Sequence, residues 1–128
     1  MRWIDRIRTT AGATLALSLI PFGYAEAQEA PTQEMIDQGR SVFVGPGNCT
    51  LCHGQDAQGG TLGPDLTDGA WIWFESEDPN LWQELTDLIR DGIEAPAEFL
   101  SPMPARGGAN LTDEQVRAVA AYVLSLNE

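Results

Sequence analysis

Lysine is absent from this sequence, and its 7 basic residues, all arginine, face 19 acidic ones. The formal net charge is −12 at pH 7. Because proteins that bind nucleic acids neutralise phosphates with lysine and arginine, this deficit argues against a nucleic-acid partner. The acidic excess instead favours attraction to a partner protein with a basic docking surface. Solubility in an exposed compartment is the alternative explanation of the charge.

Cysteine and histidine are almost as scarce as lysine. The chain has Cys49, Cys52 and His53 and no other residue of either type. A structural zinc site needs four such ligands, so a zinc site would be one ligand short. A thioredoxin-like dithiol needs a βαβ pattern around it, whereas the flanks here are a helical stretch and a glycine-rich loop. Both common uses of a C-x-x-C pair are therefore disfavoured.

No apolar run approaches the roughly 20 residues that span a bilayer. The apolar stretch 11–20 follows three arginines and precedes a small-residue site at 25–27, which is typical of a secretory signal peptide. We therefore expect residues 1–27 to be a cleaved signal peptide and 28–128 to be one exported domain without stable membrane insertion. An uncleaved anchor is the alternative. The three arginines are Arg2, Arg6 and Arg8.

The scarce cysteines and histidine stand together in the run Cys49-Thr50-Leu51-Cys52-His53. A C-x-x-C-H run is the attachment signature of a c-type haem. Thiols spaced in this way on a short turn each add to one vinyl group, and the adjacent imidazole reaches the iron. The sequence therefore predicts one covalently attached haem c, held by Cys49 and Cys52, with His53 as the proximal metal ligand.

The sixth ligand of the iron must be another side chain, water or an external molecule, because the chain has no second histidine. Met103 is the best candidate, since it lies in a loop between Pro102 and Pro104, which restrict the backbone. Gap-filling in a core is the other common role of such a methionine. Ligation by histidine and methionine raises the haem potential and fills both faces of the iron. This favours electron transfer, and we expect the protein not to be an enzyme.

Apolar residues at helical spacing predict three helices. The first begins after an N-cap at Thr32 and ends before a Gly-Pro-Gly turn. The second is expected to begin after an N-cap at Asp78 and to end at Gly92. The third begins at Thr112, with a capping box to Gln115, and runs to the end of the chain. No strand pattern is evident, so the fold class is all-α.

Long loops separate these helices. Residues 54–78 form a glycine-rich stretch, which is long for a small domain unless a prosthetic group supplies a surface to pack on. The cluster Trp71-Ile72-Trp73-Phe74 is apolar enough to cover such a group, although simple core packing explains it equally well. A second irregular stretch, 94–110, carries Met103.

The order of these elements over residues 32–126 resembles the class I monohaem c-type cytochromes of bacteria. The resemblance implies a small cytochrome c fold, with three main helices and long loops wrapped around one covalently attached haem. It also implies export, because bacteria attach c-type haems outside the cytoplasm. The segment 101–104 looks like the axial-methionine loop of this family. A propionate-binding tryptophan is implied as well, with Trp71 and Trp73 as equal candidates.

The resemblance implies roles for five further residues. Within 63–66, Pro64 matches the residue whose carbonyl accepts the proximal imidazole N–H, and Leu66 matches the leucine that packs on the ring. Gly39, Phe43 and Tyr122 match the crossing of the first and last helices.

Two roles in electron transfer are consistent with this pattern. The first is a periplasmic carrier that shuttles single electrons between redox partner proteins. The alternative is a dedicated haem c subunit of a quinoprotein dehydrogenase or terminal oxidase, to whose haem domains the glycine-rich loops are similar. A haem sensor or peroxidase-like enzyme is a third class, and it would need an exchangeable sixth site.

Overall fold

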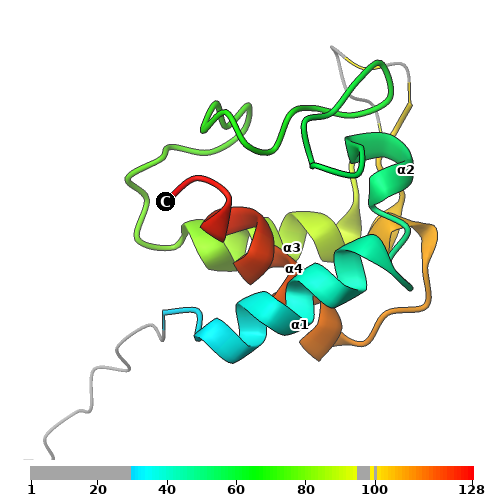
Figure 1. The fold of residues 1–128 in the computed structure, drawn as a ribbon. Helices are drawn as coiled ribbons and strands as arrows, with labels where there is room; N and C mark the ends of the chain where they lie inside the picture. Colours follow the sequence, from blue (N-terminus) through cyan, green and yellow to red (C-terminus); the bar gives the residue numbers. More distant parts are fainter. Residues whose placement is uncertain (1–29, 95–98, 100) are drawn as a thin grey trace, which may run out of the picture.

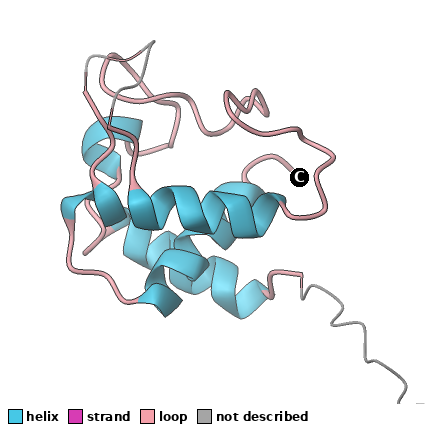
Figure 2. Ribbon diagram, turned by 180° about the vertical axis from the view of Figure 1, so that it is seen from behind, coloured by secondary structure: helices cyan, strands magenta, loops and turns pink. Residues whose placement is uncertain are grey.

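The computed structural model describes residues 30–94, 99 and 101–128, so the predicted signal peptide 1–27 lies outside the described residues. Within this part of the chain there are helices and loops but no β-strand, as the sequence predicts (Figures 1 and 2). None of these helices is long and apolar enough to cross a membrane. The elements are α1 (Gln33–Val44), α2 (Thr50–His53), α3 (Leu81–Asp91), the 3-10 turn η1 (Ala105–Gly108) and α4 (Asp113–Ser125).

The crossing of α1 and α4 is the closest helix contact. Gly39 lies in it, and a Cβ there would collide with the backbone carbonyl of Ala118, so the two helices approach at a distance that only glycine permits. Phe43 is 1% exposed and packs edge-on against Tyr122, with ring centroids 5.3 Å apart. The crossing expected of Gly39, Phe43 and Tyr122 is thereby confirmed.

Two of the three predicted helix caps are confirmed. The Thr32 side chain accepts a hydrogen bond from the backbone N–H of Met35 at the start of α1. At the start of α4, Thr112 and Gln115 form both hydrogen bonds of a capping box, so two backbone donors that the helix leaves unpaired are satisfied.

The N-cap predicted for α3 is wrong by two residues. Asn80, not Asp78, is the N-cap, and the helix begins at Leu81. The Asp78 carbonyl accepts the Leu81 N–H at 3.0 Å, while the Asp78 carboxylate accepts the Asn80 N–H at 2.7 Å. Asp78 therefore satisfies a tight turn that leads into the helix, which is another common use of aspartate next to proline.

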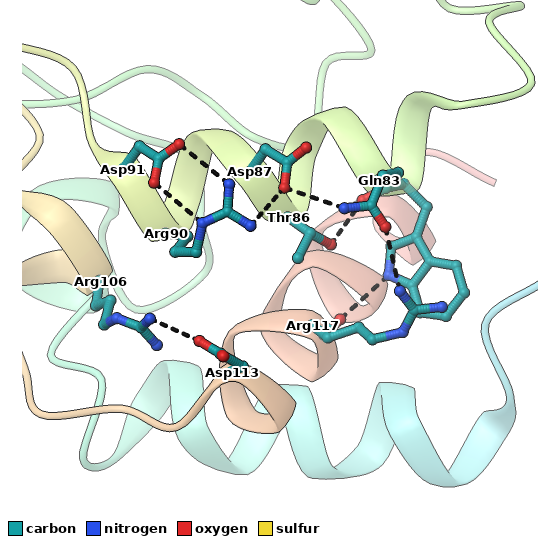
Figure 3. Close-up of polar contacts among 9 residues, drawn as sticks. Gln83, Thr86, Asp87, Arg90, Asp91, Arg106, Asp113 and Arg117 are labelled. Atoms are coloured by element: carbon teal, nitrogen blue, oxygen red, sulfur yellow. Dashed lines mark hydrogen bonds and ion pairs between the residues drawn. The ribbon is translucent and has the colours of Figure 1, made fainter.

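Helix α3 packs on α4 through a buried tryptophan. The Trp82 ring nitrogen donates to the Arg117 carbonyl at 3.1 Å, and the Arg117 guanidinium lies 3.9 Å from the centre of the same ring (Figure 3). The Thr86 hydroxyl donates to the Trp82 carbonyl inside α3. These contacts fix α3 against α4. Because α1 also crosses α4, the three helices form one packed unit.

The loop predicted for residues 54–78 contains no helix or strand; it runs on to residue 80 and passes over this unit before it enters α3 (Figure 1). Helix α2 lies at one end of the unit, directly before the loop. The loop and α2 thus cover one side of the three helices, and the candidate site lies between them.

Candidate functional site

Helix α2 is a single turn that carries all three residues of the attachment signature. Cys49 is its N-cap, and the Cys49 carbonyl accepts the N–H groups of Cys52 and His53 at 3.2 and 3.0 Å. Both cysteines are free thiols and are half-buried. The turn therefore presents two unpaired thiols and an imidazole from one rigid piece of backbone.

His53 is fixed by one hydrogen bond. Its Nδ1 lies 3.1 Å from the Pro64 carbonyl oxygen, the contact that the family resemblance implies. A carbonyl only accepts, so Nδ1 carries the proton and Nε2 keeps its lone pair for a metal. Burial lowers the pKa of His53, with the Pro64 carbonyl acting in the opposite direction. A Cβ at Gly63 would lie 3.2 Å from the imidazole, so glycine lets the loop approach the ring.

The acidity of the Cys49 thiol disfavours a redox dithiol at the C-x-x-C pair. Burial raises its pKa to about 11, with the backbone of Cys49 itself opposing the shift by a hydrogen bond to the sulfur. The attacking thiol of a redox dithiol needs a lowered pKa. In the described part of the chain, moreover, no three histidine, cysteine, aspartate or glutamate side chains gather as a metal site would require.

An apolar pocket opens beside α2. Its space amounts to about 1320 Å³, counting the part that is open to solvent. Its walls come from α2, the 54–80 loop, α3, α4 and the loop that carries Met103. Among the described residues that line it, the charged ones are Asp65, Asp68 and Arg106. The apolar lining includes Leu62, Trp71, Trp73, Leu85, Ile89 and Val119.

The residues expected to contact a haem all line this pocket. Cys49, Cys52, His53, Pro64, Leu66 and Met103 are among them. Trp71 and Trp73 both line it too, so the geometry does not choose between them as the propionate-binding residue. Two thiols and an imidazole at the edge of an apolar hollow fit a covalently attached macrocycle, whose flat faces are apolar.

Three residues of the site were missed by the sequence reasoning. Ile93 pairs with Met103 in an isolated antiparallel bridge. Arg106 reaches from the methionine loop to α4. The Asn127 side chain donates to the Leu66 carbonyl and accepts the Gly69 N–H, which ties the 54–80 loop to the end of α4. No helical periodicity marks these residues, because Asn127 contacts residues 58 and 61 positions away, while Ile93 and Arg106 act across irregular loops.

The family model and the sequence relatives that match this chain point to the same family. Residues 34–123 match the model of the family described as cytochrome c oxidase, cbb3-type, subunit III. The chain is 35% identical over 96 residues to the cbb3-type cytochrome c oxidase subunit FixP of Sinorhizobium medicae, covering 75% of this chain and 32% of that protein. It is 39% identical over 92 residues to the subunit CcoP of Rhodobacter capsulatus, covering 69% and 28%. The chain thus spans about a third of the length of these relatives.

Solved structures agree with the sequence relatives. Cytochrome cL from Methylophaga aminisulfidivorans aligns with a TM-score of 0.55 and 27% identity, over 74% of this chain and 55% of that one. Cytochrome c552 of Nitrosomonas europaea aligns with a TM-score of 0.50 and 25% identity, over 71% of this chain and 98% of that one. The predicted small cytochrome c fold and the single covalently bound haem c are supported by sequence and structure alike.

Proposed function

This chain belongs to the family of cytochrome c oxidase, cbb3-type, subunit III, and from this we propose that it is an electron-transfer haem c domain that serves a terminal oxidase. The relatives are oxidase subunits by name. They support the second of the two roles expected from the sequence, a haem subunit of a complex, better than the first, a free carrier. The observation that carries the proposal is the pocket that brings the C-x-x-C-H turn and Met103 together.

Four residues would hold the haem. Cys49 and Cys52 would form the thioethers, and His53 and Met103 would be the axial ligands of the iron. The bound haem supplies one-electron exchange between ferrous and ferric iron. The Pro64 carbonyl holds His53 in the tautomer protonated at Nδ1, and Leu66 and the cluster 71–74 give the pocket an apolar lining. This chemistry needs no nucleophile and no proton donor, so we propose that the protein performs no reaction on a substrate.

The partner is proposed to present a basic surface on the periplasmic side of the membrane. The 54–80 loop, which lines the pocket, carries acidic side chains and no basic one. The arginines of α3, η1 and α4 already have partners within the chain. Arg90 and Arg106 form ion pairs, and the Arg117 guanidinium lies over the Trp82 ring. The acidic residues of the loop are Asp56, Asp65, Asp68, Glu75, Glu77 and Asp78.

Affinity purification from the native host tests the role in an oxidase. We expect the tagged holoprotein to bring down the catalytic oxidase subunit in a constant ratio, with haem that is reduced by the donors of the oxidase and reoxidised by oxygen. Co-purification with a dehydrogenase instead, or a protein that is monomeric at all concentrations and exchanges electrons with unrelated donors equally well, would contradict the proposal.

A further inference from the structure

The backbone of Met103 is held at both of its polar groups. Its N–H donates to the Ile93 carbonyl at 3.0 Å, and its carbonyl accepts the Ile93 N–H at 2.7 Å. Ile93 comes directly after Gly92, the residue that caps the C-terminal end of α3. The position of the thioether is therefore coupled to the end of α3 rather than left to a free loop.

Gly92 brings the two segments into contact. Its φ is +77°, and a Cβ at this position would lie 2.5 Å from the Met103 carbonyl oxygen and 2.6 Å from the Ala105 nitrogen. Both are backbone atoms, so they cannot turn aside as the end of a flexible side chain could. The methionine loop packs as it does because residue 92 has no side chain.

Arg106 holds the other side of the same loop. One terminal nitrogen donates to the Leu111 carbonyl at 2.9 Å, and the other lies 2.6 Å from the Asp113 carboxylate at the start of α4 (Figure 3). Arg106 adopts a φ of +56°, a conformation that residues other than glycine rarely adopt and that the surrounding contacts must maintain. Its forked guanidinium suits two acceptors in different directions, which a lysine ammonium serves less well.

We infer that Gly92 and Arg106 are positioning residues that set the strength of the Met103 bond to iron, one clamping the methionine loop to α3 and the other to α4. The inference rests on the proposed haem site. A ligand held in its binding geometry loses little freedom when the bond forms, so each clamp shifts the equilibrium toward the ligated iron. Neither residue touches the iron in this role, and each acts through the backbone of residues 103–106.

The first test compares Gly92→Ala with Gly108→Ala in the haem-loaded protein. Both glycines have positive φ values, +77° and +76°, so both variants place alanine at a φ that it rarely adopts. A Cβ at Gly108 meets only side-chain atoms of Pro104, at 3.4 Å or more. The difference between the two variants therefore reports what is specific to residue 92, including the collision with the backbone of the methionine loop.

We expect ferric Gly92→Ala protein to lose most of the long-wavelength sulfur-to-iron absorption band. Its ferrous form should bind carbon monoxide at least about tenfold faster than wild type, a factor that corresponds to about 1.4 kcal/mol. Gly108→Ala should keep the wild-type band and rate. A folded, haem-loaded Gly92→Ala protein with the wild-type band and rate would overturn the role of Gly92, and so would an equal change in both variants.

The second test compares Arg106→Gln and Arg106→Lys with Arg117→Gln, and it tests the Arg106 half of the inference even if Gly92→Ala does not fold. Arg117 also links two helices, through Trp82 and Gln83, but it lies away from the methionine loop. We expect Arg106→Gln to weaken the band and lower the midpoint potential, with Arg106→Lys between it and wild type. Arg117→Gln should lower thermal stability alone.

Two results would contradict the inference, and they differ in whether the proposed haem site also fails. If Arg106→Gln changes thermal stability but neither the band nor the potential, as expected of Arg117→Gln, then Arg106 is merely structural and the inference fails while the haem site stands. If wild-type holoprotein has no sulfur-to-iron band, Met103 is not the ligand, and both the proposed axial pair and the inference fail.

Discussion

The imidazole of His53 shows how single residues of this chain are prepared for their roles. One carbonyl, from Pro64, sets its tautomer, and burial keeps its pKa low, so the ring is neutral with Nε2 available to a metal. Gly63 and Pro64 form a backbone wall against the ring. At this scale the site is defined by a few atoms whose protonation and orientation follow from their neighbours.

Met103→Ala tests the sixth ligand. Without the thioether we expect the sulfur-to-iron band to disappear and the potential to fall by on the order of 0.1 V, within the roughly 0.8 V range that axial ligands span. The haem should remain attached, because Cys49 and Cys52 are unchanged. Met35→Leu is the control, since Met35 packs against the core. Spectropotentiometry makes the measurement, and an unchanged spectrum in Met103→Ala would remove Met103 from the site.

Asp65 gives a prediction for pH. Its carboxylate accepts hydrogen bonds from the Thr67 hydroxyl and N–H, both at 2.7 Å, and these hold its pKa below the usual value. A lowered pKa in the folded state means that the contribution to stability is present above about pH 4, the pKa of an unfolded aspartate, and is lost as the pH falls further.

Thermal unfolding of wild type and Asp65→Asn across this range measures the effect. Asparagine keeps an acceptor oxygen but does not titrate. We expect wild type to be the more stable at neutral pH and the difference to shrink between about pH 5 and pH 3. A difference that does not depend on pH would show that the charge of Asp65 contributes nothing.

Among the helices, the α1–α4 crossing determines where the site can form. Gly39 allows the crossing, Phe43 is buried in it, and Phe43 also lies 6.4 Å from the His53 ring, measured between centroids. The helix pair thus borders the proximal side of the pocket. A change in the crossing should therefore affect both stability and the environment of the haem.

Gly39→Ala tests this contact. In an exposed helix the change from glycine to alanine stabilises by up to about 1 kcal/mol. Here the added Cβ collides with the Ala118 backbone, and we expect a net loss of about 1–3 kcal/mol, typical of overpacking. Gly60→Ala is the matched control, because nothing lies within 4 Å of its Cβ position. Chemical denaturation of the two holoproteins measures the difference, and equal stabilities would contradict the role of Gly39.

Sequence patterns captured what is local in this fold. The caps at Thr32 and Thr112 and the C-x-x-C-H turn depend on residues within four positions of one another, so the sequence alone revealed them. Asp78 was misplaced because aspartate before proline serves equally well in a turn and at a helix N-cap. The roles of Arg106 and Asn127 could not be predicted, because the tertiary arrangement of the loops on α4 determines their partners.

Over the whole molecule the charge distribution matters most for association. The net charge of −12 and the acidic 54–80 loop should steer the protein toward a basic partner. Since the loop also lines the haem pocket, docking there would bring the partner close to the redox centre. Charge thus affects the rate of encounter, whereas the pocket sets the redox chemistry.

The salt dependence of the electron-transfer rate tests whether the acidic loop steers docking. We expect the bimolecular rate at which a basic donor protein reduces the haem to fall at least about tenfold between low and high ionic strength. Neutralising the exposed Glu75 and Glu77 with glutamine should reduce this dependence, whereas Glu34→Gln on α1 should leave it nearly unchanged. A rate that rises with salt, or equal effects of the loop and α1 variants, would contradict docking on the loop.

The most direct test of the whole account is the mass and haem content of the denatured protein, expressed in a host with working haem-ligation machinery. We predict one haem that stays with the polypeptide after denaturation, adds its mass to the chain, gives the pyridine haemochrome spectrum of two thioethers and leaves neither Cys49 nor Cys52 free to alkylate. A colourless protein of unmodified mass, with both thiols reactive, would contradict it.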